Sequence, residues 1–186
     1  MTTDWSTRIS RGFTTGELRS ATRVALGELL GVDASALSLA VVWSVGLASA
    51  HPGRVPDVAA EVLARPSGPD EDVAFVAWDL DAAAVEVNVI VLGDPDEGDE
   101  HGGVRLHAAP YRAAHSCVLA IATAITAACL GGSPVWDERT TLSDRRVADP
   151  ECLVERLRQP PGKSAWDAAL DLLRGTGLRD AADPDW

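Results

Sequence analysis

The chain has 186 residues, of which 46% are hydrophobic and 24% are charged, a composition typical of one folded domain rather than of a disordered segment. Its formal net charge of −12 disfavours binding to nucleic acid phosphates and to anionic membrane surfaces. The densest basic run, Arg145–Arg146, does not offset that charge because Asp144 and Asp149 flank it. A cationic partner, either a basic protein or a metal ion, is therefore what the composition favours.

The first half of the chain predicts a flexible lead, a helix and a strand. Residues 1–13 are polar and lack periodicity, so we expect a flexible lead with an exposed Trp5. Thr14 and Glu17 have capping-box spacing, and the apolar positions behind them predict a helix over 15–30 that ends at Gly31. Residues 37–48 alternate bulky and small side chains, which predicts a strand, and 57–64 favours a short helix.

The second half predicts a hairpin, a central helix and a helical C-terminal part. Residues 73–79 and 85–92 read as an antiparallel hairpin, and 133–138 as a short strand. The uncharged run over about 110–130 predicts a helix laid across the sheet, against the bulky face of the 37–47 strand. Asp149 and Ser164 each open a further helix, and 179–186 is a second flexible tail. This order predicts a single α+β domain over 1–186, with a mostly antiparallel sheet of about four strands.

Cysteine usage and the N-terminus favour a cytoplasmic protein. Cys117 and Cys129 lie too far apart on one helix for a disulfide, so with Cys152 we expect three free thiols. Residues 1–13 lack the apolar segment of a secretion signal. The helical part of the uncharged run is too short to cross a bilayer, which favours a buried core helix.

No motif indicates a metal, cofactor or nucleophile. The acidic loop 94–100 lacks the spacing of a calcium-binding EF-hand, and His101, His107 and His115 lack zinc-ligand spacing. Cys117 lies among apolar residues, which raise the pKa of a thiol. We expect no cofactor and no bound metal.

The most charged segment, 137–149, is the candidate functional region. It is read as a solvated and self-paired turn, as a protein-binding face or as a catalytic cluster, and under the first two readings reversing Asp137 and Glu138 to Lys leaves stability unchanged. A tryptophan amid arginine and aspartate favours the binding face if it is exposed. The candidate partner-binding residues are Trp136, Asp137, Glu138, Arg139, Asp144, Arg145 and Arg146.

The order of helix, strand, hairpin, long helix, strand and helix in a small acidic chain resembles type III secretion chaperones, and its composition resembles that of small acidic toxin-immunity proteins. The resemblance covers residues 14–158 and implies a non-enzymatic domain that binds a partner protein. Two alternatives stay open. One is a small metal-assisted hydrolase that uses the 137–149 loop, and the other is a structural subunit, such as a homodimer, that associates through the small-residue face of the 37–48 strand.

Overall fold

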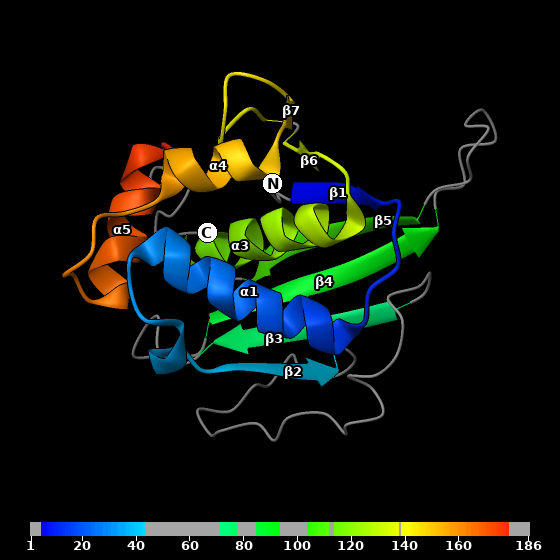
Figure 1. Cartoon of the computed structure of the whole chain (residues 1–186), viewed down its shortest axis with the longest axis horizontal. Coiled ribbons are helices and arrows are strands. Elements are labelled where there is room, and N and C mark those ends of the chain that lie inside the picture. The colour runs from blue at the N-terminus through cyan, green and yellow to red at the C-terminus, as the bar shows by residue number, and fades with distance from the viewer. Residues whose placement is uncertain are drawn as a thin grey trace.

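In a computed structural model, helices cover one face of a seven-stranded antiparallel sheet (Figure 1). The structure describes residues 5–43, 71–77, 85–93, 104–111, 114–137 and 139–178. The predicted 57–64 helix, the acidic loop 94–100, His101 and the 179–186 tail lie outside these residues. The predicted fold class, a single α+β domain, is confirmed.

The sheet contains all four predicted strands. In the order β2-β3-β4-β5-β1-β6-β7, the predicted strands correspond to β2, β3, β4 and β6, and the expected β3–β4 hairpin is antiparallel. Strands β1, β5 and β7 were not anticipated. The bounds are β1 Trp5–Ile9, β2 Leu39–Trp43, β3 Glu71–Ala77, β4 Val85–Gly93, β5 Val104–Tyr111, β6 Val135–Trp136 and β7 Val147–Ala148.

The helices begin and end where local signals predict them, with one exception. Helix α1 spans Thr15–Leu30, and Thr14 and Glu17 form the expected capping box. Gly31 closes α1 with a φ of 65°, and a Cβ there would lie 2.7 Å from the carbonyl oxygen of Gln159. The other helices are the 3₁₀ turn η1 Ala34–Ala36, α3 Ala114–Gly131, α4 Pro150–Leu157 and α5 Ala165–Gly175.

The exception is the start of the long helix, which begins at Ala114 and not near Pro110. Pro110 instead pairs with Val87 in β5. Among the described residues, the register of β1 with β5 covers residues 104 to 108 of β5, so Pro110 lies beyond the part of β5 that is paired with described residues of β1.

The expected flexible lead is wrong for residues 5–9. These residues form β1, which pairs with β5 on one side and with β6 on the other. Trp5 is fully buried, not exposed. The sequence does not predict this strand because it is short and mixes polar Ser6, Thr7 and Arg8 with its apolar residues. Pairing with β5 and β6 stabilises it as a strand.

Helix α3 is the centre of the core. Its residues Val118, Leu119, Ile121 and Ile125 are at most 1% exposed. It lies on β1, β4 and β5, whereas α1 lies over β2. Leu39 and Val41, on the bulky face of β2, are buried as expected, but α1 provides the helix that covers them.

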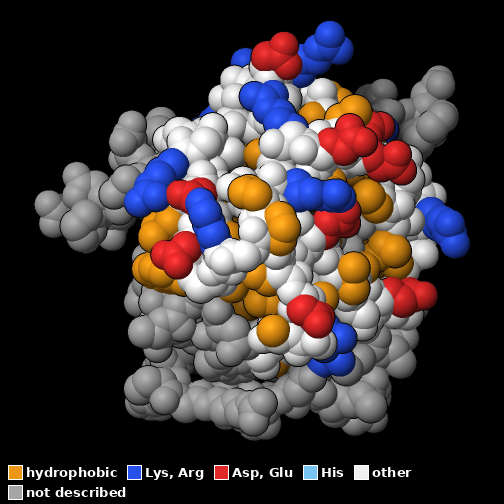
Figure 2. All heavy atoms as spheres, turned by 60° about the vertical axis from the view of Figure 1, so that its left-hand side comes forward, with side chains coloured by type: hydrophobic (Ala, Val, Ile, Leu, Met, Phe, Trp, Pro, Cys, Tyr) orange, Lys and Arg blue, Asp and Glu red, His pale blue; other side chains and the backbone are white. Residues whose placement is uncertain are grey.

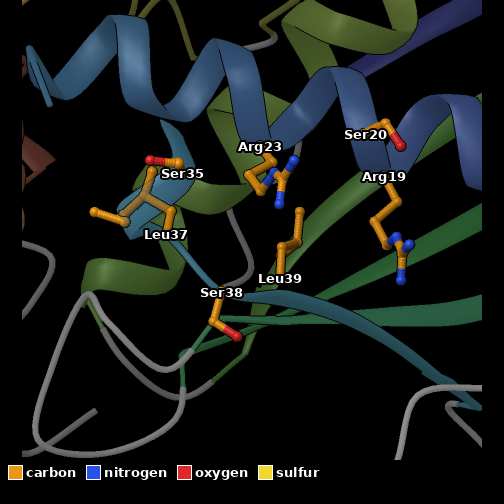
Figure 3. A pocket seen from close by; sticks show the side chains of 8 residues that line it. Arg19, Ser20, Arg23, Ser35, Leu37, Ser38 and Leu39 are labelled. Carbon is orange, nitrogen blue, oxygen red and sulfur yellow. The ribbon is translucent and has the colours of Figure 1, made fainter. Parts of the chain in front are cut away.

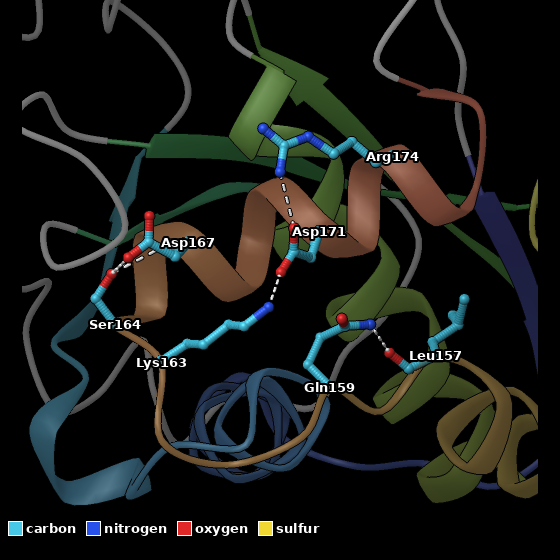
Figure 4. A network of polar contacts seen from close by, with 7 residues as sticks. All are labelled: Leu157, Gln159, Lys163, Ser164, Asp167, Asp171 and Arg174. Carbon is cyan, nitrogen blue, oxygen red and sulfur yellow. Dashed lines mark hydrogen bonds and ion pairs between the residues drawn. The ribbon is translucent and has the colours of Figure 1, made fainter.

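Helix α5 contacts α3 through a ring stack and is stabilised along its own length by ion pairs. The rings of His115, at the start of α3, and Trp166 stack with their centroids 3.7 Å apart. Within α5, Asp171 pairs with Lys163 and Arg174, and Ser164 caps the helix by accepting a hydrogen bond from the Asp167 N–H (Figure 4). The stack therefore joins α5 to α3, whereas the ion pairs and the cap stabilise α5 and the residues that lead into it.

The core position of Ile121 makes a first prediction. Ile121→Asp puts an unpaired charge where no water reaches, so we expect a loss of more than about 4 kcal/mol or no folded protein. The matched control is Val24→Asp, because Val24 is 57% exposed and tolerates a charge. Circular dichroism with urea unfolding measures both variants, and an Ile121→Asp protein as stable as the control would contradict the central role of α3.

The ion pairs of Asp171 lead to a second prediction, on how the stability of the fold depends on pH. Hydrogen bonds from Lys163 and then Arg174 lower the pKa of the Asp171 carboxyl below its usual value. A lowered folded-state pKa stabilises the fold above the unfolded-state pKa, and this contribution is lost as the pH falls through the folded-state value. We therefore expect Asp171→Asn to lower Tm at pH 7 and to match the unsubstituted protein below about pH 2. A Tm difference that persists in acid would assign the loss to packing.

Candidate functional site

The candidate residues lie on the β6–β7 hairpin at one end of the sheet. Trp136 and Val147 are cross-strand partners, and the N–H of Asp137 donates to the carbonyl of Arg146 at 2.8 Å, which closes the intervening turn. Because Val135 is fully buried toward the helices, its neighbour Trp136 lies on the opposite face of the sheet.

Trp136 is partly exposed, as a binding face requires. Its side chain is 39% exposed, and the guanidinium carbon of Arg105 lies 5.7 Å from the ring centroid. This distance is within the range of a cation–π contact. Trp136 and Val147 therefore form a small apolar patch beside an arginine from β5.

Asp137 is buried, which contradicts the expected solvated position. It is 1% exposed, and its carboxylate accepts hydrogen bonds from the Thr141 hydroxyl at 3.1 Å and from the Leu142 N–H at 2.6 Å. Both contacts lie inside the turn, so Asp137 holds the loop in shape. The expectation that Asp137 is solvated is therefore wrong, and its burial instead predicts that replacing it by Lys lowers stability.

The expected pairing of the remaining hairpin charges with one another is not seen among the described residues. Arg139, Asp144, Arg145 and Arg146 are exposed, and in the described part of the chain none of them forms an ion pair. Glu138 lies outside the described residues. With Asp137 buried, the described tip of the hairpin presents three arginines to one aspartate.

The described histidines and cysteines do not meet as a metal or nucleophile site. His115 is buried in its stack on Trp166, and burial raises the pKa of the Cys117 thiol to about 11. Within the described ranges, no three His, Cys, Asp or Glu residues lie close enough to hold a metal ion. No described helix is long and apolar enough to cross a membrane.

A groove between α1, α3 and α4 was missed by sequence reasoning. It has a volume of about 350 Å³, and Val24 on its wall is 57% exposed. The only hint in the sequence is that Val24 falls outside the buried stripe of α1. The lining residues are Ala21, Val24, Ala25, Glu28, Ile125, Thr126, Cys129, Leu130 and Val154.

A second cavity of about 440 Å³ adjoins this groove and brings acidic side chains to it. Cys129 lines both cavities, and Asp149 and Glu151 line the second. Burial raises the pKa of the Cys129 thiol, and the nearby charges of Glu151 and Asp149 raise it further. The groove therefore has an apolar wall and an acidic end.

Comparison with known proteins gives no relative: no family model, curated protein or solved structure matches this chain.

Asp137 and Asp144 allow a matched test of the hairpin. Asp137→Ala removes the acceptor of the buried Leu142 N–H, so we expect a loss of about 2 kcal/mol in the free energy of unfolding. Asp144→Ala, which removes the same charge from an exposed position, is expected to change it by less than about 0.5 kcal/mol. Urea unfolding measures the stability of both variants. Equal losses would contradict the conclusion that Asp137 holds the turn in shape.

Proposed function

We propose that this chain is a non-enzymatic protein-binding domain, of the chaperone or immunity kind, that binds a basic segment of a partner protein in the groove between α1, α3 and α4. The observation that carries the proposal is the exposed apolar wall of this groove next to acidic side chains. The same chemistry fits a segment with apolar residues on one side and Lys or Arg on the other.

The apolar part of the proposal rests on Val24. Large hydrophobic side chains with more than a third of their surface exposed are few in the described ranges, and Val24 is the most exposed of them. Around it, Ala21 and Ala25 leave space that a partner side chain fills. Figure 2 shows that, on the face it draws, hydrophobic side chains lie in groups between acidic and basic ones. This mixture is typical of a protein interface with apolar anchors and a charged rim.

The preference for a basic segment rests on the acidic side chains near the groove that form no ion pair with described residues. Glu28 is already paired with Arg158, so it contributes little net charge to the groove. Asp149 and Glu151 are exposed, and they line the cavity that shares Cys129 with the groove. With the net charge of −12, they favour the approach of a cationic segment.

No described feature favours the two alternatives. The hydrolase hypothesis needs carboxylates that are free to hold a metal, but both oxygens of Asp137 accept hydrogen bonds within the loop. The oligomer hypothesis needs an open small-residue face on β2. Ala40 on that face is only 8% exposed, so it is already buried within the single chain.

Peptides of opposite charge test the proposal. We expect a fluorescent amphipathic peptide of about 15 residues built from Leu and Lys to bind saturably, with an affinity that falls as salt rises. The same peptide with Glu in place of Lys is expected not to bind. Val24→Arg, which fills the groove with a like charge, is expected to weaken the Lys peptide at least about tenfold. Fluorescence anisotropy measures all three.

The control separates the groove from the overall charge. Glu151→Gln and Asp144→Asn each remove one exposed acid, the first beside the groove and the second on the hairpin. Only Glu151→Gln is expected to weaken binding. Equal losses, or full binding by Val24→Arg, would assign peptide binding to net charge and would contradict the groove.

A further inference from the structure

The β6–β7 hairpin exposes apolar side chains as the groove does. Trp136 and Val147 are cross-strand partners and are 39% and 38% exposed. Among the large hydrophobic side chains of the described ranges, these two and Val24 have more than a third of their surface exposed. Val24 lies on the wall of the groove between α1, α3 and α4. The large exposed hydrophobic side chains of the described ranges therefore lie at two places, the hairpin and the groove.

The hairpin is also locally cationic, in contrast to the whole chain. Residues 138–147 include three arginines and two acids, which gives this stretch a net charge of +1 in a chain of −12. Arg139, Arg145 and Arg146 are exposed, and none of them forms an ion pair with a described residue. Their guanidinium groups can therefore donate to carboxylates that lie outside the hairpin.

Hydrogen bonds within the turn fix the shape in which these arginines are presented. The buried carboxylate of Asp137 accepts the N–H of Leu142 at 2.6 Å. The hydroxyl of Ser143 donates to the carbonyl of Arg145 at 2.7 Å and accepts from the N–H of the same residue at 3.1 Å. A segment that is ordered before it binds loses less conformational entropy on binding, which favours the hairpin as a binding element.

The groove and the cavity beside it offer the complementary surface. The groove volume of about 350 Å³ is large enough to take an apolar side chain of a partner. Asp149 and Glu151 line the adjoining cavity, are exposed, and form no ion pair with described residues. Only Oδ1 of Asp149 accepts the cap hydrogen bonds from the N–H groups of Glu151 and Cys152, so its other oxygen can accept from a guanidinium group.

We propose that the groove of one copy of this protein binds the β6–β7 hairpin of a second copy, with Trp136 and Val147 against Val24 and the hairpin arginines facing Asp149 and Glu151. The hairpin is paired through β6 to β1 in its own sheet, so the groove receives it from another copy. The inference rests on the proposed function, since the second copy occupies the same groove and a partner segment displaces it. The contact joins two different surfaces, so it is heterologous and can continue beyond a dimer.

Sedimentation equilibrium at physiological salt measures this association. The weight-average mass is expected to rise above the 19.5 kDa of one chain as the protein concentration approaches about 500 μM. The Leu/Lys peptide is expected to return it to the mass of one chain with peptide bound. Arg145→Glu with Arg146→Glu is expected to weaken self-association at least about tenfold but to bind the peptide as before, because its groove is unchanged.

A mixture of two variants gives the sharpest test. The hairpin variant, Arg145→Glu with Arg146→Glu, has an intact groove, and the groove variant, Val24→Arg, has an intact hairpin. Neither is expected to associate alone. Together they are expected to form a complex of two chains that grows no further, since the groove and the hairpin left over are both altered. No complex between the two variants, each shown to be folded by circular dichroism, would overturn the proposal.

Arg23→Glu with Arg156→Glu is the matched control, because it reverses two exposed arginines outside the hairpin. Arg23 extends from α1 toward the beginning of β2 and does not line the groove (Figure 3). Arg156 comes two residues after Val154 of the groove wall, about 200° around α4. The control is expected to associate as the unsubstituted protein does, and a loss equal to that of the hairpin variant would assign association to net charge and overturn the proposal.

The peptide measurement separates this inference from the proposed function. A protein that binds the Leu/Lys peptide but stays a single chain up to about 500 μM would overturn the self-association alone. A protein that neither binds the peptide nor associates would contradict the proposed function as well.

Discussion

The burial of α3 is the constraint on which the rest of the fold depends. Ala114–Gly131 has no charged residue, and Ser116, Thr123 and Thr126 are buried with it. The hydroxyls of Thr123 and Thr126 donate to the carbonyls of Leu119 and Ala122 four residues earlier, so these polar groups are satisfied inside the helix itself. With these two hydroxyls bonded to its own carbonyls, the helix can bury most of its surface. It packs on β1, β4 and β5 on one side and on α1, α4 and α5 on the other, while Cys129 near its end stays exposed.

This arrangement gives α1 two flanks that lie outside the core. Its buried stripe, which includes Leu18, Thr22 and Leu26, faces the core. Arg19 and Arg23 then fall on the flank toward β2, while Val24 and Glu28 fall on the flank toward α3 and α4. One helix therefore borders a pocket with arginine and serine in its described lining (Figure 3) and an apolar groove, and the 3.6-residue period keeps them apart.

The parts of the fold that local signals determine could be predicted from the sequence. The capping box of Thr14 and Glu17, the Asp149 cap and the alternation around Leu39 depend on neighbours within a few residues. Strand β1 could not be predicted, because its hydrogen-bond partners come from residues about 100 or more positions away. The buried position of Asp137 was missed for a related reason. Alternating charges predict solvent exposure, but the turn places the N–H of Leu142, five residues later, within hydrogen-bond distance of the Asp137 carboxylate. The groove and the pocket likewise exist only once separate elements pack.

Net charge alone therefore describes this surface poorly. Several acids are engaged in local backbone geometry: Glu17 and Asp149 at helix starts, Asp33 at η1, and Asp137 in the hairpin turn. Their hydrogen bonds fix the chain while their charges still add to the total of −12. At physiological ionic strength a charge acts over about 8 Å, so a partner senses the acids and arginines beside it rather than the total. Asp149 and Glu151, which line one cavity together, therefore present a locally acidic surface, whereas the described tip of the β6–β7 hairpin presents mainly arginines on the same small domain.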